Sequence, residues 1–191
     1  MESKTVGFAL CGSFCTYEPV LAAMAALARQ YETVIPILSY NSAQTDTRFG
    51  TARSFRARIE AVCGHSVIDA IAGAEPIGPK KLLDLLIVAP CTGNTLAKLA
   101  HGIADTPVTL AVKSHLRNAR PVVLAVSTND ALSANAANLG LLLARKHFFF
   151  VPFGQDSPTQ KPCSLVADFS LLPETAALAL AGKQLQPILL R

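Results

Sequence analysis

The sequence lacks the long apolar run that a membrane span requires. A transmembrane helix needs roughly 18 or more consecutive apolar residues, and no run in these 191 residues reaches that length. The N-terminal stretch MESKTVGFAL leads directly into a predicted strand and does not resemble a signal peptide. We therefore expect no membrane association and a cytoplasmic location.

Charge of either sign is also scarce. Charged residues make up 16% of the chain, and the formal net charge is +4. Lys and Arg are scattered along the sequence rather than gathered in a stripe, which is not the pattern of a nucleic-acid-binding surface. We expect no nucleic acid among the partners of this protein.

The five cysteines lack the paired spacing of a zinc site. Cys11 and Cys15 have three residues between them rather than two, which weakens a redox or metal interpretation. Reduced and mostly buried thiols in a cytoplasm fit this usage best. We therefore expect no bound metal.

Hydrophobic residues, in contrast, are abundant at 51% of the chain. A chain of this length can bury a substantial core as one domain. The apolar excess must be covered, either between helices and a sheet or against other subunits. We expect a single domain over residues 1–191 and a homo-oligomer.

Short apolar runs alternate with helical patterns along the chain. Strands are predicted at residues 5–10, 33–38, 66–71, 85–89, 121–126 and 147–152. Helices are predicted at residues 20–31, 51–64, 96–103, 108–116, 131–146 and 171–181. This alternation predicts an α/β fold, a doubly wound Rossmann-like or flavodoxin-like parallel sheet of about six strands with helices on both faces. Residues 153–168 are predicted to form a long polar loop, and the apolar tail 184–191 is predicted to dock on a neighbour.

The strand at 85–89 leads into a cluster of small polar residues. Pro90 is expected to end this strand, and a helix is predicted to begin after the cluster. The cluster consists of Cys91, Thr92, Gly93, Asn94 and Thr95. A helix N-terminus favours an anion, and ligands of open α/β sheets bind at the carboxyl ends of strands. The simpler alternative is that Thr92 or Asn94 only caps the helix.

Three other predicted strand ends carry similar residues. They are Gly12 with Ser13, Ser39, and Ser127 with Thr128 and Asn129. Because parallel strands bring their carboxyl ends to one edge of a sheet, all four clusters are expected to lie together. This convergence favours a bound phosphate-bearing cofactor over simple capping.

At these residues the chain resembles the flavoprotein family that includes cysteine decarboxylases and flavin prenyltransferases. The family pattern P-A-S/T-x-N-T stands here as residues 90–95, and the helix end G-(I/L)-A-D stands as residues 102–105. The resemblance implies FMN as cofactor. The implied FMN contacts are Gly12, Ser13, Ser39, Thr92, Gly93, Asn94, Thr95, Ser127 and Thr128.

Three further stretches resemble the B subunits of dipicolinate synthases of spore-forming bacteria. They are SYNSAQTDTRFG, AEPIGPKKLLD and FVPFGQDSPTQKPCSLVAD. In that family two subunits make pyridine-2,6-dicarboxylate by dehydrogenating a dihydro- or hydroxytetrahydro-dipicolinate from the lysine (diaminopimelate) pathway. The resemblance implies that the partner is the dehydrogenase-like A subunit of dipicolinate synthase, that NAD(P) belongs to this partner, and that both work in the mother-cell cytoplasm during sporulation.

Two alternative functions remain open from the sequence. One is a non-catalytic subunit that binds FMN or substrate, and the other is an FMN-dependent decarboxylase. The segment STNDALSAN stands where the decarboxylases have P-x-M-N-x-x-M, which disfavours decarboxylation.

A small dicarboxylate substrate calls for cationic and proton-transferring side chains. The predicted substrate contacts are Arg48, Arg53, Lys98 and Lys161. The predicted catalytic residues are Asn94, His101 and Arg48. His101 is chosen because an imidazole can transfer a proton near neutral pH. Its alternative role is to cap the carbonyls at the end of its helix.

Overall fold

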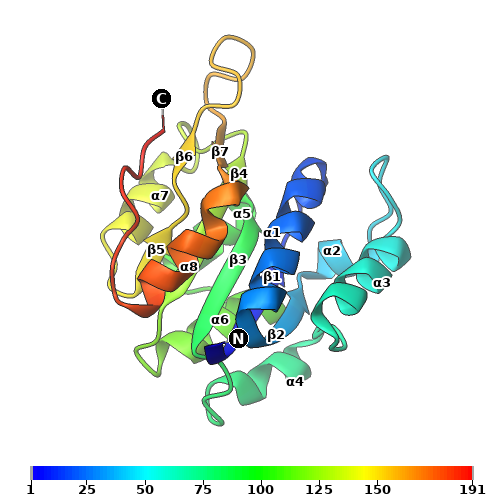
Figure 1. The fold of residues 1–191 in the computed structure, drawn as a ribbon. Helices are drawn as coiled ribbons and strands as arrows, with labels where there is room; N and C mark the ends of the chain where they lie inside the picture. Colours follow the sequence, from blue (N-terminus) through cyan, green and yellow to red (C-terminus); the bar gives the residue numbers. More distant parts are fainter. Residues whose placement is uncertain (1, 191) are drawn as a thin grey trace.

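The computed structural model describes residues 2–190, and five parallel strands form the centre of its sheet (Figure 1). In spatial order these strands are β2 (Tyr31–Leu38), β1 (Glu2–Leu10), β3 (Leu85–Cys91), β4 (Val122–Thr128) and β5 (Phe148–Phe150). All seven residues of β3 are buried, as expected for a strand covered on both faces. The predicted α/β fold class is confirmed.

Helices cover both faces of the sheet. Their bounds are α1 (Tyr17–Gln30), α2 (Tyr40–Gln44), α3 (Ala52–Cys63), α4 (Ile71–Ala74), α5 (Gly93–His101), α6 (Pro107–Leu116), α7 (Ala136–Leu143) and α8 (Leu172–Leu180). Single 3₁₀ turns stand at Phe14–Thr16, Glu75–Ile77 and Phe169–Leu171. Helices α1 and α8 contact each other in front of the sheet in Figure 1, whereas α5 contacts α6 and α7 on the other side.

The predicted polar loop 153–168 contains a short antiparallel hairpin. Its strands are β6 (Phe153–Gly154) and β7 (Leu165–Ala167), and β7 pairs with Ser127 and Thr128 at the end of β4. The intervening segment, orange in Figure 1, rises beyond the carboxyl ends of the parallel strands. This antiparallel extension was not predicted, because strands of two or three residues are too short to show a pattern.

The chain's last described residues lie along this hairpin. The amide of Phe153 donates to the carbonyl of Ile188 at 3.0 Å, and the amide of Leu190 donates to the carbonyl of Phe153 at 2.9 Å. Residues 184–190 therefore pack on their own chain, while Leu189 stays 64% exposed, and docking of the tail on a neighbouring chain stays a prediction.

Two strand predictions are also corrected. Residues 66–71 form no strand, and only Ile68 pairs with β2, through an isolated bridge to Ile37. The segment is confined between the end of α3 and the start of α4, so it cannot extend the pairing. Pro90 does not end β3, which continues to Cys91 with a shift in its register to β4. The carbonyl of Pro90 still accepts a hydrogen bond from Cys11, at 3.3 Å.

The helix predicted at 131–146 is shorter in the structure. Residues 129–135 form turns in which the carbonyl of Asp130 accepts from the amides of Ser133 and Asn135, at 3.1 and 3.0 Å. Helix α7 begins only after them. Asp and Asn favour such turns because their side chains compete with helical hydrogen bonding.

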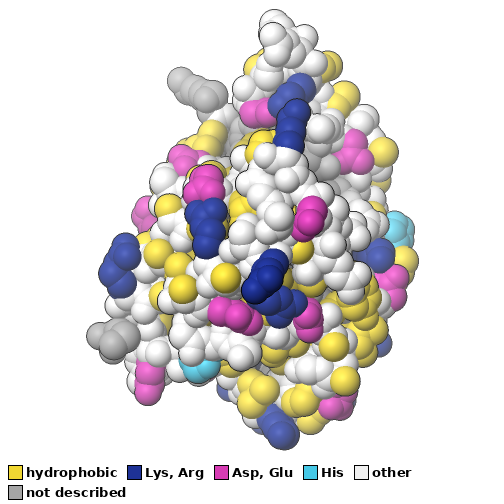
Figure 2. Space-filling view, turned by 90° about the vertical axis from the view of Figure 1, so that its right-hand side faces the viewer, with side chains coloured by type: hydrophobic (Ala, Val, Ile, Leu, Met, Phe, Trp, Pro, Cys, Tyr) yellow, Lys and Arg dark blue, Asp and Glu magenta, His cyan; other side chains and the backbone are white. Residues whose placement is uncertain are grey.

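The side of the molecule that carries β2 and α3 is a mixed-charge surface. Figure 2 shows Lys and Arg interspersed there with Asp and Glu rather than collected in one basic patch. Arg58 pairs with Glu18 at 2.7 Å, and Arg56 pairs with Asp69. No helix within residues 2–190 is long and apolar enough to cross a membrane.

His115 makes folding stability depend on pH. It is buried at the end of α6, where its Nε2 lies 3.0 Å from the carbonyl of Pro121, and burial lowers the pKa of this imidazole to about 4. The unfolded chain, with a pKa near 6.5, binds the proton first as pH falls, so stability decreases below about pH 6.5.

We expect His115→Gln to lack this component of the pH dependence. The native chain should lose about 2 kcal/mol of unfolding free energy from this group between pH 7 and pH 5. Urea unfolding at both pH values measures the loss, with the exposed His65→Gln as the matched control. Equal losses in native chain and His115→Gln would contradict the assignment.

Candidate functional site

The carboxyl ends of β1, β2 and β3 border a cavity of about 340 Å³. Its lining comes from the turns after these strands, from the first turns of α5 and from the residue that caps α6. The lining residues are Cys11, Gly12, Ser39, Tyr40, Asn41, Thr92, Asn94, Thr95, Lys98 and Thr106. We call this the β2-side cavity. The sequence predicted Gly12, Ser39, Thr92, Asn94, Thr95 and Lys98 as site residues, and the structure brings these six together here.

A second cavity, of about 400 Å³, lies between β1, β4 and the hairpin. It is lined by Ser13, Cys15, Thr16, Thr92, Ser127, Thr128, Asn129, Asp156, Lys161 and Val166. We call this the β4-side cavity. Thr92 lines both cavities, so the two lie on either side of the turn between β3 and α5. Four predicted contacts, Ser13, Ser127, Thr128 and Lys161, lie in this second space.

Thr92 caps helix α5. Its Oγ1 accepts a hydrogen bond from the amide of Thr95 at 3.4 Å and lies 3.2 Å from the hydroxyl of Thr95. The Thr95 hydroxyl in turn donates to the Cys11 sulfur at 3.2 Å. The exposed Asn94 side chain has no hydrogen-bond partner in residues 2–190, so its amide is free to meet a ligand. The capping alternative therefore holds for Thr92 and leaves Asn94 available.

The turns after β1 and β2 are fixed by short local hydrogen bonds. Ser13 adopts a left-handed backbone with φ 68°, uncommon for a residue with a side chain, and its carbonyl accepts from Thr16. The Ser13 and Ser127 hydroxyls lie 2.7 Å apart, which joins the ends of β1 and β4. Ser39 caps α2 by accepting from the amide of Ser42 at 3.3 Å.

Gly93 is needed because a carboxylate packs against the start of α5. The Asp130 carboxylate accepts from the Thr128 hydroxyl at 2.6 Å and from the Asn135 amide at 2.7 Å. A Cβ on Gly93 would lie 2.5 Å from Asp130 Oδ1. A negative charge near a helix N-terminus is stabilising, so this side of α5 is already complemented by the protein's own carboxylate.

The two lysines that line the cavities are each paired with a carboxylate. Lys98 Nζ lies 2.9 Å from both carboxylate oxygens of Asp105 and holds the pKa of that carboxyl below its usual range. Lys161 Nζ lies 3.1 Å from Asp156 Oδ2 across the hairpin segment. Neither lysine is thus an uncompensated cation.

Two buried thiols lie beneath the site. Burial raises the pKa of Cys11 to about 11 and raises that of Cys91 well above its usual value. Both thiols are therefore protonated at neutral pH. A protonated thiol is a poor nucleophile, and these cysteines behave as small apolar residues.

Four predicted site residues do not line either cavity. Gly93, an implied FMN contact, is buried at the start of α5 against the Asp130 carboxylate. His101 is exposed at the far end of α5, about 12 Å along the helix axis from Gly93. Arg53 is exposed in the first turn of α3, and Arg48 is exposed in a turn where its guanidinium lies 4.9 Å from the Phe49 ring. Their proposed roles toward substrate stay predictions.

Several lining residues were not singled out from the sequence. They are Cys11, Cys15, Thr16, Tyr40, Asn41, Thr106 and Val166. Tyr40 and Asn41 directly follow Ser39, so their position just after β2 could have identified them as lining residues. Thr106 and Val166 come from segments whose approach to the site depends on tertiary packing.

Comparison with known proteins places this geometry in a family. The Flavoprotein family model matches residues 1–159, which include both polar turns around β3 and β4. The chain belongs to the flavoprotein family. Among flavoproteins, the B subunit of dipicolinate synthase from Bacillus subtilis (strain 168) is 48% identical over 189 residues, covering 99% of this chain and 94% of that protein.

Solved flavoprotein structures agree with this relationship. The crystal structure of the dipicolinate synthase B subunit from Bacillus halodurans C has a TM-score of 0.90 and 44% identity, covering 98% of this chain and 96% of that chain. A dodecameric FMN-dependent UbiX-like decarboxylase from Escherichia coli O157:H7 has a TM-score of 0.61 and 25% identity, covering 78% and 79%. This flavoprotein is thus a homologue of the B subunit of dipicolinate synthase.

We expect Gly93→Ala to lower the unfolding free energy by about 1–3 kcal/mol, because the new methyl group overlaps the Asp130–Asn135–Thr128 cluster. Gly140→Ala is the matched control. Gly140 lies in α7 with nothing within 4 Å of an added Cβ, so this change should raise stability by about 0.5–1 kcal/mol. Urea denaturation measures both, and a stable Gly93→Ala would refute the close packing.

Proposed function

We propose that this flavoprotein binds FMN at the carboxyl edge of its sheet and acts as the B subunit of dipicolinate synthase. In this role it takes part, with a dehydrogenase-like A subunit that carries NAD(P), in the dehydrogenation of a dihydro- or hydroxytetrahydro-dipicolinate to dipicolinate during sporulation. The observation that carries the proposal is the pair of cavities on either side of Thr92, in a chain 48% identical to a dipicolinate synthase B subunit over nearly its whole length.

The residues around the β2-side cavity fit FMN. Gly12 has no side chain to obstruct a phosphate, and the Ser39 turn and the first amides of α5 point hydrogen-bond donors toward the same edge. Asp130 already occupies the β4 side of the α5 N-terminus, which disfavours a second anion there. The proposed position of the phosphate is therefore near Gly12 and Ser39. Bound flavin supplies hydride and electron transfer.

The protein's own side chains act by binding and orienting. Asn94 offers an amide to the flavin ring or to the substrate, and Thr92 fixes the helix start from which Asn94 projects. Lys161 and Asp156 border the β4-side cavity, where Lys161 is the cation that a substrate carboxylate would meet.

One observation favours a second candidate, a B subunit that binds flavin or substrate without performing acid–base chemistry. Within the described residues, the lysines that line the two cavities are ion-paired, and no histidine lines either space. Proton transfer would then belong to the partner dehydrogenase. An active assembled enzyme that keeps its turnover after His101→Gln would favour this candidate.

We also propose that the chain forms a homo-oligomer. Leu132, Leu141 and Leu143 expose 43–47% of their surface in and just before α7, and exposed leucines of this kind are stabilised by burial against a second copy of the chain.

We expect Asn94→Ala to weaken FMN binding about tenfold, because one hydrogen-bonding group toward the ligand is lost. Quenching of FMN fluorescence on titration with protein gives the Kd. Stability should stay unchanged, because Asn94 is exposed and makes no side-chain hydrogen bond within residues 2–190. Gln44→Ala, at an exposed position of α2 outside both cavities, is the control. If the native chain binds no FMN, the cofactor proposal is wrong.

We expect Lys161→Ala to raise the KM of the assembled enzyme for its dicarboxylate about tenfold. The exposed ion pair with Asp156 contributes at most about 1 kcal/mol, so folding should be unaffected. Steady-state kinetics with the partner dehydrogenase measures the KM, with Lys183→Ala as control. An unchanged KM with weaker binding of the partner would instead assign Lys161 to the contact between the two chains.

A further inference from the structure

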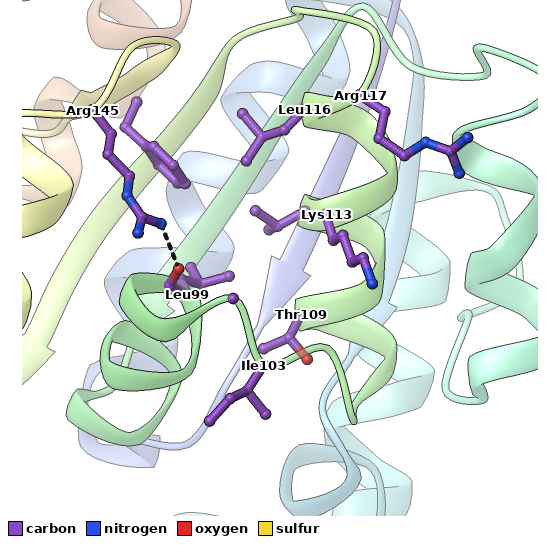
Figure 3. A pocket seen from close by; sticks show the side chains of 10 residues that line it. Leu99, Ile103, Thr109, Lys113, Leu116, Arg117 and Arg145 are labelled. Carbon is purple, nitrogen blue, oxygen red and sulfur yellow. Dashed lines mark hydrogen bonds between the residues drawn. The ribbon is translucent and has the colours of Figure 1, made fainter.

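A third hollow lies away from the proposed cofactor edge. It is a groove of about 330 Å³ between the end of α5, one side of α6 and the start of β5 (Figure 3). Its lining residues are Leu99, Gly102, Ile103, Thr109, Val112, Lys113, Leu116, Arg117, Arg145 and Phe148. None of them lines the β2-side or the β4-side cavity.

The groove follows helix α6 for two turns. Thr109, then Val112 with Lys113, then Leu116 with Arg117 face it, which is a spacing of three or four residues along one side of the helix. Eight residues of helix span about 12 Å. A groove of this length beside a helix suits apolar anchors at positions i, i+3 or i+4, and i+7 of a second helix.

The floor is apolar and partly open to solvent. Leu99 approaches from α5, Ile103 from the segment that follows α5, and Leu116 from α6, as Figure 3 shows. Ile103 has 47% of its surface exposed. Covering apolar surface of this kind lowers the free energy of the system.

The lining carries three cations and no acid. Arg145 donates to the carbonyls of Leu99 and Ala100 at 3.0 and 2.6 Å, so it caps the end of α5 and is held in place. Lys113 on α6 and Arg117 directly after it are exposed and form no ion pair within residues 2–190. An apolar floor with a positive rim is complementary to an acidic amphipathic segment.

We propose that this groove docks an acidic amphipathic helix of a different chain, the partner dehydrogenase of the enzyme. The proposal rests on the proposed function, since that function supplies the partner. This chain's own helices are a poor match, because none of those described in residues 2–190 carries more than one acidic residue. Two copies meeting by a twofold axis at this groove would also oppose their positive rims.

The test is the affinity of the purified native chain for the purified partner dehydrogenase from the same organism, measured by calorimetry at low and at physiological salt. The double variant Lys113→Glu with Arg117→Glu, called the rim variant, reverses the charge of the rim. It should weaken binding about tenfold and reduce the salt dependence of the affinity. The matched control is Arg29→Glu with Lys183→Glu, which makes the same charge change at exposed positions outside the groove. The control should bind the partner dehydrogenase like the native chain.

A second variant tests the floor. Ile103→Ser should also weaken binding of the partner dehydrogenase, with little cost to folding because Ile103 is half exposed. Fluorescence titration with FMN should give the native Kd for all variants, since the groove lies outside both cavities.

Several outcomes would overturn the docking proposal. Native affinity of the rim variant for the partner dehydrogenase is one, and an equal loss of affinity in the control is another. A change in oligomeric state of the rim variant by light scattering, with partner binding intact, would assign the groove to a second copy. Cosedimentation of the native chain, but not the rim variant, with phosphatidylglycerol vesicles and intact partner binding would assign it to an anionic lipid surface.

A failure of the proposed function gives a different result. A native chain that binds no FMN, in a mixture with the partner dehydrogenase that forms no dipicolinate, refutes the function. A pair that forms dipicolinate while the rim variant binds the partner normally refutes only the docking site.

Discussion

The burial of β3 between β1 and β4 constrains every feature of the carboxyl edge. Because all seven residues of β3 are buried and it is paired with a strand on each side, the sheet fixes the position of the turn that follows it. Thr92 leaves the sheet there and caps α5. The two cavities are separated by this turn, so the shape of the site follows from a strand that touches no ligand itself.

Most charged groups at this edge have a compensating partner within the chain. Asp130 complements the start of α5, Lys98 pairs with Asp105, and Lys161 pairs with Asp156. A site of this kind recognises ligands through directed hydrogen bonds more than through free charge. It is suited to hold a reactive cofactor in a fixed orientation. A site that performs proton transfer needs, in addition, a titratable group that can donate a proton to the substrate or accept one from it.

The sequence predicted those features that depend on local pattern. The strands β1 to β4 are continuous apolar runs, and their polar ends could be assigned to one edge because parallel strands share direction. The hairpin of β6 and β7 could not be predicted, because its strands exist only through pairing with β4 and with each other. Arg48 follows β2 by ten residues and was placed near the edge by that proximity, whereas the turn that carries it is exposed. The role of Asp130 could not be predicted for a related reason, because its carboxylate packs against Gly93, which lies 37 positions away in the sequence.

The backbone bonds between Phe153 and residues 188–190 have a consequence for synthesis. The central parallel strands are complete once β5 has been made, but the hairpin that walls the β4-side cavity is held at its base by residues near the end of the chain. On the ribosome, the sheet can therefore form while this wall is still unsupported. A nascent chain stopped before residue 188 would keep its central sheet and lose the brace of one cavity wall. Quality control that monitors only the core would not detect the difference.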